Sequence, residues 1–277
     1  MKNSINYKYD ESKIANQLLE MMGAGLFSTE EMKKTERKIK RMLCYYQCAL
    51  METETKFRVL NEEFSLRHER NPISTIQTRL KDPRSIIEKM RRRGFPLTLE
   101  SMEENVFDIA GIRAVCSFVD DVYFVANCLR NQDDIRILQI KDYISDPKDN
   151  GYRSLHMIIE IPIFLAAEKR VMKVEVQLRT IAMEFWANLD HKMRYKKNID
   201  PEVEKKIENE LLECALLSAN LDQRMQRVRN IIESGLMPAS SQIPGQESFE
   251  KITLDTDMKE VDIPDEDIPD EDDASWE

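Results

Sequence analysis

A dense group of cations lies in the segment RLKDPRSIIEKMRRRG, which starts at Arg79. Pro83 suits the first turn of a helix. On such a helix three polar residues four and three positions apart share one face: Ser85, Lys89 and Arg92. Arg79 and Lys81 flank the start of this helix, where the backbone N–H groups and the helix dipole favour an anion. The segment therefore predicts a cradle for a polyphosphate, although a solvated basic helix face would give the same spacing.

A carboxylate stands shortly before a pattern typical of a buried strand. Asp108 precedes residues 111–118, which are rich in valine, isoleucine and alanine and include Arg113. An aspartate at the edge of a strand can bind a hard metal ion. Aspartate is more commonly a turn residue at such a place, so this motif alone leaves both interpretations open.

A third candidate segment, KDNGYRSLH, starts at Lys148. Its Asn-Gly pair permits a tight turn with positive φ, so the turn presents Tyr152 and Arg153 at the mouth of the next strand. His156 lies on the face of that strand opposite its apolar residues. A tyrosine, an arginine and a histidine on one surface suit stacking on a base and pairing with phosphates. A histidine held in the core is the alternative.

Polar and apolar residues alternate in the segment KVEVQLRT, residues 173–180. On a strand this alternation places four polar side chains on one face: Lys173, Glu175, Gln177 and Arg179. Such a row, flanked by apolar sequence, favours a functional face over simple solvation. The helix that follows contributes Glu184, Asp190 and His191, with Trp186 expected in the core.

These segments belong to an alternating helix and strand pattern of about 120 residues. Helices are expected at residues 84–93, 120–131 and 180–195, and strands at 111–118, 135–140, 154–161 and 172–178. Amphipathic helices flank this pattern at 28–66, opened by the capping box STEE, and at 200–233, opened by Asp200-Pro201. A short helix is expected before Gly23. The predicted class is α/β with helical extensions at both ends.

The net charge of -10 is an average over two unlike parts of the chain. Residues 255–277 hold twelve acids and one base, a charge of −11, so residues 1–254 carry +1. This tail contains IPDED twice in tandem from Ile263, a composition that cannot bury enough apolar area to fold. The body is therefore a nearly neutral globular unit with basic patches of its own.

The sequence also argues against several classes of site and location. The five cysteines lack paired zinc spacing and are expected to be buried and reduced, and three histidines are too few for a multi-histidine metal centre. No segment approaches the roughly 18 uninterrupted apolar residues of a membrane span, and the first residues lack the apolar stretch of a signal peptide. We expect a cytoplasmic protein that does not contact a membrane.

Four segments in this order resemble the synthetase domain of the RelA/SpoT-homologue family, and in particular its stand-alone branch, the small alarmone (p)ppGpp synthetases. They are RLKDPRSIIEKMRRRG, DIAGIRAVC, IKDYISDPKDNGYRSLH and VEVQLRTIAMEFWANLDH, within residues 71–197. Each is weak alone, whereas the ordered set is highly specific. The resemblance implies an α/β (α+β) fold with a nucleotidyltransferase-like mixed β-sheet flanked by helices. It also implies transfer of the β,γ-diphosphate of ATP to the 3′-OH of GDP or GTP, releasing AMP, in stringent-response alarmone synthesis.

The resemblance also assigns roles to individual residues. Arg79 and Arg113 would sandwich the adenine, and the ATP phosphates would be held by Lys81, Ser85, Lys89 and Arg92. Asp108 and Glu175 would bind Mg²⁺, and Glu175 is the candidate acceptor of the 3′-OH proton. Tyr152 would stack on the guanine near Gln177. The acceptor phosphates would be held by Lys148, Arg153 and His156.

Departures from the family pattern leave alternatives open. Glu184 stands where relatives can carry another polar residue, so it is left out of the predicted site. The segment QIKD, residues 139–142, keeps the Lys-Asp pair that is linked in longer relatives to a preference for GDP, but it has glutamine where they have arginine. The segment therefore favours GDP over GTP as the acceptor only slightly. Hydrolase activity is not expected, because the region before Arg79 offers His68 alone. The alternatives are a toxic relative that diphosphorylates the 3′ end of tRNA and a non-catalytic nucleotide-binding assembly module.

The expected organisation has four parts. Residues 1–70 form a helical N-terminal extension, 71–197 the synthetase domain, 198–236 a C-terminal helical region and 237–277 a disordered acidic tail. The two amphipathic extensions are expected to build a homo-oligomer, a tetramer by resemblance, although packing within one chain would explain them too. No stable nucleic-acid partner is expected, since an almost neutral body and an anionic tail do not favour many phosphate contacts.

Overall fold

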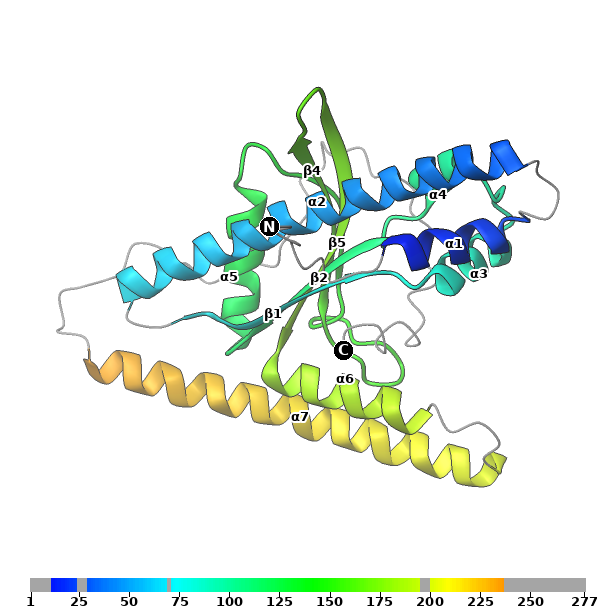
Figure 1. The fold of residues 1–277 in the computed structure, drawn as a ribbon. Helices are drawn as coiled ribbons and strands as arrows, with labels where there is room; N and C mark the ends of the chain where they lie inside the picture. Colours follow the sequence, from blue (N-terminus) through cyan, green and yellow to red (C-terminus); the bar gives the residue numbers. More distant parts are fainter. Residues whose placement is uncertain (1–10, 24–28, 69–70, 195–199, 237–277) are drawn as a thin grey trace, which may run out of the picture.

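The structure is a computed structural model that describes residues 11–23, 29–68, 71–194 and 200–236 (Figure 1). The first half of the chain forms α1 (Glu11–Met21), α2 (Thr29–His68), β1 (Ile73–Leu80), α3 (Pro83–Arg92), α4 (Leu99–Asn105) and β2 (Ala110–Cys116). The second half forms α5 (Val119–Arg130), β3 (Arg136–Asp142), β4 (Leu155–Phe164), β5 (Lys169–Thr180), α6 (Ile181–Arg194) and α7 (Pro201–Leu236).

Five strands form one mixed sheet in the order β1-β2-β5-β4-β3. β2 and β5 run parallel, and the other neighbouring pairs are antiparallel. The predicted α/β class, with a mixed sheet flanked by helices, is confirmed. Across the parallel pair Gly111 lies opposite Glu175 and Arg113 lies opposite Gln177. Residues that the sequence separates by more than sixty positions are therefore neighbours on the sheet.

The main hydrophobic core lies where α2 and α5 pack against the sheet. In Figure 1 α2 crosses the strands, and it contacts β1, β2, β4 and β5. The predicted apolar face of α2 is buried at Ile39, Leu43 and Phe57. From β5 the core takes Val174, Val176 and Leu178, as the alternating pattern predicted. The polar residues between them consequently point to the other face of the sheet.

A second, smaller core joins the C-terminal helices to the segment before β4. It consists of Tyr152, Trp186, Ala187, Leu211 and Ala215. α6 and α7 pack side by side (Figure 1), and the Nε1–H of Trp186 donates to the backbone oxygen of Leu211 at 2.8 Å. The expected core position of Trp186 is thus confirmed. α7 is therefore attached to the same loop that carries the predicted acceptor-binding residues.

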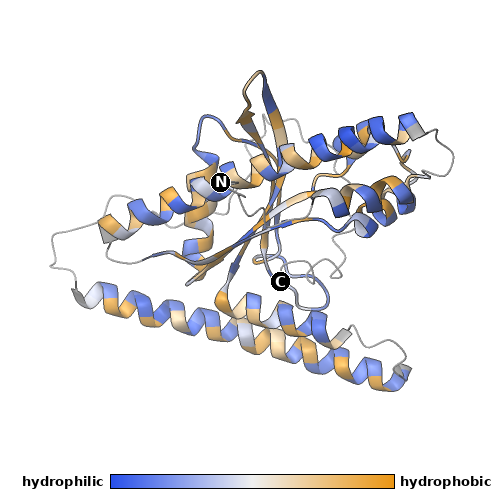
Figure 2. Cartoon of the chain, in the orientation of Figure 1, coloured by the Kyte–Doolittle hydropathy of each residue, from blue (hydrophilic) through white to orange (hydrophobic). Residues whose placement is uncertain are grey.

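The long helix α7 leaves many of its apolar residues exposed. Figure 2 shows apolar residues recurring along α7, and many of them are exposed, among them Leu217, Leu221 and Ile232.

None of the helices in the described parts of the chain is both long enough and apolar enough to cross a membrane.

Helix α3 forms where the sequence pattern placed it, for identifiable reasons. The side chain of Asp82 caps its N-terminus by accepting the N–H of Arg84 at 2.8 Å and of Ser85 at 3.4 Å. Pro83 occupies the first turn, where a missing N–H costs nothing. Gly94, with φ of 69°, follows the end of the helix. The apolar residues of α3 are fully buried: Ile86, Ile87 and Met90.

Two elements of the fold are absent from our sequence-based prediction. β1 is an edge strand, paired with β2 alone and irregular between Ile73 and Thr75, so its residues lack strict apolar alternation. α4 spans only seven residues, capped by Thr98, too few to show a helical period. β4 and β5 also extend beyond their predicted ends, to Phe164 and back to Lys169. The missed strand matters because Arg79 lies on it.

The cysteines are only partly as expected. All five are free thiols, and Cys116 is buried. Cys44 and Cys214, however, are exposed, so the expectation of burial is wrong for them. Both lie on long amphipathic helices, where the period alone does not tell which residues at the border of the apolar face are covered. The acidic tail, residues 237–277, and the capping residue Ser28 lie outside the described residues.

Candidate active site

Two lysines and one aspartate meet where β1 and α3 approach the start of β2. Lys81 Nζ lies 3.2 Å and Lys89 Nζ 2.8 Å from Oδ2 of Asp108. The N–H of Lys81 donates to the backbone oxygen of Ile109 at 2.8 Å, which ties the end of β1 to the segment entering β2. Asp108 lies in a turn just before β2, as the alternative interpretation expected, and its side chain is in addition a charge partner for both lysines.

The charges of this group shift one another's pKa values. Burial alone would raise the pKa of Asp108, but Lys81 and Lys89 outweigh it and hold that pKa well below its usual range. Burial lowers the pKa of Lys81, and Asp108 opposes part of that change. Asp108 is consequently ionised at neutral pH. Its second oxygen, Oδ1, is buried and makes no hydrogen bond within the described residues.

A second carboxylate, Glu175 of β5, lies between residues of two other strands. Its Oε2 is 3.4 Å from Arg79 Nη2 of β1, and its Oε1 is 3.7 Å from His156 Nδ1 of β4. All three side chains are at most 3% exposed. The pairing of β1 with β2, and of β2 and β4 with β5, brings these side chains together.

Gln177 and Arg113 form the next group along the same face. Gln177 Oε1 accepts from Arg113 Nε at 3.2 Å and from Nη2 at 2.9 Å. The two residues lie opposite each other across β2 and β5, and His156 lies opposite Gln177 across β4 and β5. Arg113 also pairs with Glu184 of α6, with Nη1 3.1 Å from Oε1.

An aromatic group lies next to His156. The hydroxyl of Tyr152 is 2.8 Å from His156 Nε2, and Arg179 Nη2 donates to the same hydroxyl. The ring of Tyr143 packs against Tyr152 with centroids 6.1 Å apart. Lys148 Nζ lies 4.9 Å from the Tyr152 centroid and 5.2 Å from that of Tyr143. Lys148 therefore contacts the ring face on which a base could stack.

Three predicted residues lie at the margin of these groups or away from them. Arg153 donates through Nη2 to the backbone oxygen of Ile144 at 2.9 Å, and it lines a small recess against α6 and α7 that also includes Asp222. Ser85 lies in the first turn of α3. Arg92 lies at the exposed C-terminal end of α3.

Sequence reasoning left out three residues that the structure adds to this face. The sequence pattern puts Arg179 on the polar row of its strand without a role, leaves Glu184 outside the predicted site and does not single out Tyr143. Arg179 lies at the end of β5, and Glu184 lies five residues later, in the first turn of α6. Because that turn brings the start of the helix back toward the end of the strand, this spacing could have predicted their contact.

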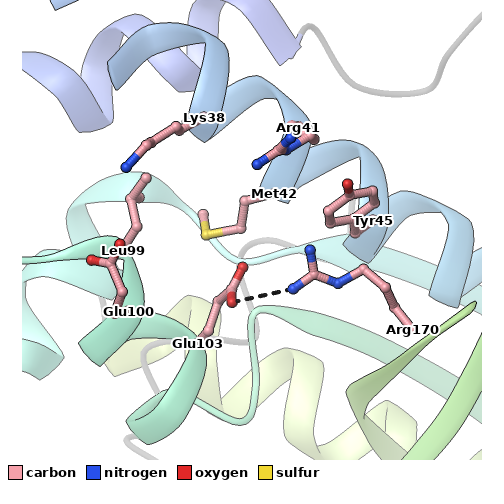
Figure 3. A pocket seen from close by; sticks show the side chains of 8 residues that line it. All are labelled: Lys38, Arg41, Met42, Tyr45, Leu99, Glu100, Glu103 and Arg170. Carbon is pink, nitrogen blue, oxygen red and sulfur yellow. Dashed lines mark ion pairs between the residues drawn. The ribbon is translucent and has the colours of Figure 1, made fainter. Parts of the chain in front are cut away.

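A different recess lies between α2, α4 and β5 (Figure 3). Its lining residues are Lys38, Arg41, Met42, Tyr45, Leu99, Glu100, Glu103 and Arg170. Figure 3 shows Arg170 joined to Glu103, a pair 3.6 Å apart. The predicted site residues are not part of this lining, so we do not count the recess as part of the candidate site.

Known proteins are similar to this chain over much of its length. A family model described as the region found in RelA / SpoT proteins matches residues 78–200. The GTP pyrophosphokinase YwaC of Bacillus subtilis is 42% identical over 212 residues, which are 76% of this chain and 100% of the relative.

Two solved structures from Bacillus subtilis are similar over most of the chain. The small alarmone synthetase 2 matches with a TM-score of 0.62 and 40% identity, over 69% of this chain and 98% of that one. The small alarmone synthetase 1 bound to its product pppGpp matches with a TM-score of 0.64 and 31% identity, over 71% and 99%. With a relative of 42% identity matched over its whole length, this chain belongs to the RelA/SpoT family, in its branch of small alarmone synthetases, the GTP pyrophosphokinases.

Proposed function

We propose that the chain is a (p)ppGpp synthetase that transfers the β,γ-diphosphate of ATP to the 3′-OH of GDP or GTP and releases AMP. The observation that carries the proposal is the convergence of two ionic groups on one face of the sheet. Asp108 with Lys81 and Lys89 forms the first group, and Glu175 with Arg79 forms the second. Phosphoryl transfer requires positioning and charge neutralisation more than covalent chemistry, and these groups supply both.

The donor half of the site would hold ATP as the family pattern implies. Arg79 and Arg113, on the paired strands β1 and β2, would contact the adenine. Lys81 and Lys89 would hold the phosphates together with the N-terminal turn of α3, which carries Ser85, and with Arg92 at its far end. In support, the nitrogens of both lysines already contact one anionic oxygen, that of Asp108. Phosphate oxygens would replace that contact with others of the same kind.

Mg²⁺ fits the carboxylates of this site. Asp108 Oδ1 is a buried oxygen without a hydrogen bond inside the described residues, and Glu175 is the second carboxylate of the face. Mg²⁺ commonly takes one or two carboxylates plus substrate phosphates, and this face offers two carboxylates. When bound, the ion neutralises charge that develops on the phosphoryl oxygens. Asp108 and Glu175 would hold it.

The acceptor half would be built around Tyr152. Its hydroxyl is fixed by His156 and Arg179, so the ring face is the part that can stack on guanine. Lys148 now lies over that face, and guanine would displace its amine toward the acceptor phosphates. Gln177 would contact the base edge, with His156 and a reoriented Arg153 on the phosphates.

The chemical step places the proton on Glu175. The 3′-oxygen of the acceptor attacks the β-phosphorus of ATP, and the bond from that phosphorus to the oxygen shared with the α-phosphate breaks, so AMP leaves. Glu175 would accept the hydroxyl proton within hydrogen-bond reach. Arg79 Nη2, 3.4 Å from Glu175 Oε2, would help to hold this carboxylate in position for the acceptor.

A nucleotide assay tests the proposal. Purified protein, Mg²⁺ and labelled ATP should give ppGpp with GDP, pppGpp with GTP, and AMP in equal amount. GMP in a parallel reaction shows whether the 5′-diphosphate is needed. If no alarmone and no AMP form with any acceptor, the proposal is wrong. AMP formation only when deacylated tRNA is added would instead identify the tRNA-modifying alternative.

We also propose that the chain forms a homo-oligomer through its long helices. Exposed apolar residues on α7 are spaced four, four, three and four apart: Leu217, Leu221, Met225, Val228 and Ile232. This spacing is typical of a helix that packs along another helix. Light scattering should give a multiple of the 32.6 kDa chain mass. Leu221→Glu should lower that mass, whereas Glu213→Gln on the same helix should not. A monomeric wild type would refute the proposal.

We also propose that the chain has four parts, with the bounds expected from the sequence. Residues 71–197 would be the synthetase unit, with helical extensions at 1–70 and 198–236 and an acidic tail at 237–277. In support, β1, the first strand of the sheet, begins at Ile73, and α7 spans Pro201–Leu236.

A further inference from the structure

Glu184 contacts two buried arginines from two different strands. It lies in the first turn of α6, directly after β5. Its Oε1 is 3.1 Å from Arg113 Nη1 of β2, and its Oε2 is 2.9 Å from Arg179 Nη1 of β5. Asn188, one turn further along α6, donates to Oε1 at 3.1 Å. Both oxygens of one carboxylate are thus used to hold two guanidinium groups.

The burial of these groups makes the contacts strong. The side chains of Arg113 and Arg179 are 0% and 1% exposed, and that of Glu184 is 14% exposed. A buried guanidinium needs both a counter-charge and hydrogen bonds, and charge-assisted hydrogen bonds are stronger than neutral ones. Glu184 supplies negative charge to both arginines at once. Its loss would leave each of them with less compensation.

The contacts fix the orientation of Arg113. Gln177 binds one edge of its guanidinium through Nε and Nη2, and Glu184 binds Nη1 at the other end. A planar group held at both ends presents its faces in a fixed direction, and an arginine face is a surface on which a base can stack. Preorganisation of this kind reduces the entropy lost when a ligand binds.

The contacts fix Arg179 in the same way, toward the other half of the site. Its Nη1 pairs with Glu184 and its Nη2 donates to the hydroxyl of Tyr152. That hydroxyl is also 2.8 Å from His156 Nε2. Glu184 is therefore linked through one side chain, Arg179, to the two residues around which the acceptor site is proposed.

We propose that Glu184 is a positioning residue that orients the donor-side Arg113 and the acceptor-side Arg179–Tyr152 pair together. The inference rests on the function proposed above. Removing this carboxylate should weaken the binding of both nucleotides, although Glu184 is placed to touch neither. Contacts that act equally in the ground state and the transition state change KM more than kcat.

Glu184→Gln tests this, because it keeps the length of the side chain but presents an amide that cannot accept from one of the arginines. We expect KM for ATP and KM for the acceptor each to rise by about tenfold or more, with a smaller change in kcat. Glu184→Asp keeps the charge on a shorter side chain and should restore part of both values. The matched control is Glu213→Gln, an exposed glutamate on α7, which should change neither KM.

The possible outcomes separate the two ideas. If wild-type protein makes no product, the proposed function fails, whatever the variants do. If wild-type protein is active and Glu184→Gln, folded by circular dichroism, keeps both KM values within about twofold, the positioning role is wrong. A rise confined to one substrate would also overturn it, because the inference requires both halves to respond. Should Glu184→Gln not fold, the Glu184→Asp comparison carries the same test, with smaller expected rises in both KM values.

Discussion

At the scale of single residues, the candidate site holds its cations and carboxylates against one another. Lys81 and Lys89 contact Asp108, and Arg79 contacts Glu175. A substrate phosphate or a metal ion would therefore exchange partners with groups that are already paired. These buried groups lose their hydration when the chain folds, so the free energy of that desolvation does not weaken substrate binding.

Neutralising either carboxylate should remove activity. We expect Asp108→Asn and Glu175→Gln each to lower kcat by at least about a hundredfold, because each variant removes a proposed metal ligand and the second also removes the proton acceptor. Turnover with labelled ATP measures the effect.

Two exposed carboxylates provide controls of matched chemistry for these variants. Asp133→Asn and Glu210→Gln change surface residues and should leave kcat unaltered. Thermal unfolding should show that all four variants are folded. A folded Glu175→Gln that retained more than about a tenth of the activity would contradict the assigned role.

Thiol chemistry should separate the cysteines by burial. Exposed Cys44 and Cys214 should react rapidly with Ellman's reagent, whereas burial raises the pKa of Cys128 to about 11 and suppresses its reactive thiolate at pH 8. Cys116 is fully buried, and its pKa is also raised. We expect two fast thiols in native protein and five after denaturation. A Cys44→Ser variant should lose one fast thiol, and rapid reaction of all five in native protein would contradict the described burial.

At the scale of elements, α7 packs against the end of β5, against α6 and against the loop that carries the proposed acceptor residues. Thr180 at the end of β5 donates to Asp222 of α7 at 2.7 Å, and the Trp186 indole binds the backbone of Leu211. Gly151, with φ of 89°, lies so close to α7 that an added Cβ would be 2.5 Å from Cβ of Ala215. The close packing of this loop against a helix leaves no room for a side chain there.

Gly151→Ala should therefore weaken acceptor binding selectively. The new methyl group would both strain the positive φ and force the loop away from α7. We expect KM for GDP or GTP to rise severalfold, KM for ATP to change little and the melting temperature to fall.

Gly94→Ala separates the two causes, since Gly94 also has positive φ, 69°, but nothing lies within 4 Å of its added Cβ. It should lower stability by about 1 kcal/mol without a selective effect on the acceptor. Equal changes in both KM values in Gly151→Ala would argue against a specific link between α7 and the acceptor loop.

Elements with a complete local signal could be predicted from the sequence, and contacts that depend on strand register could not. α3 has its cap at Asp82, its proline and its apolar face within ten residues, and β5 alternates along most of its length. β1 has a single partner strand and no clean alternation, so it was missed. Glu175, Gln177 and Arg113 could be named as site candidates, but their contacts depend on the parallel pairing of β2 with β5, which no local pattern encodes.

At the scale of the whole molecule, charge and catalysis occupy different parts of the chain. Residues 1–254 carry +1 and residues 255–277 carry −11. All candidate site residues lie between Arg79 and Glu184. The acidity of the full chain is thus not a property of the surface that would meet nucleotides.

Deleting residues 255–277 should leave synthesis almost unchanged. We expect kcat and both KM values within about twofold of the full chain, since the proposed contacts are all retained, while the isoelectric point rises from about 5.1. Parallel assays at low and high salt compare the two chains, because any long-range repulsion of nucleotides by the tail would be screened by salt. A loss of activity at both salt concentrations would show that the tail has a direct role.

The parallel pairing of β2 with β5 also has a kinetic consequence. Gly111 and Glu175 are opposite each other but 64 positions apart, and the chain between them builds α5, β3 and β4. Closing so long a loop costs entropy that is recovered only when the strands pair, and non-local pairings of this kind slow folding. The contact of Arg113 with Gln177 across the same pair of strands should therefore form late on the folding path. During refolding from denaturant, helical signal should return well before nucleotide binding does.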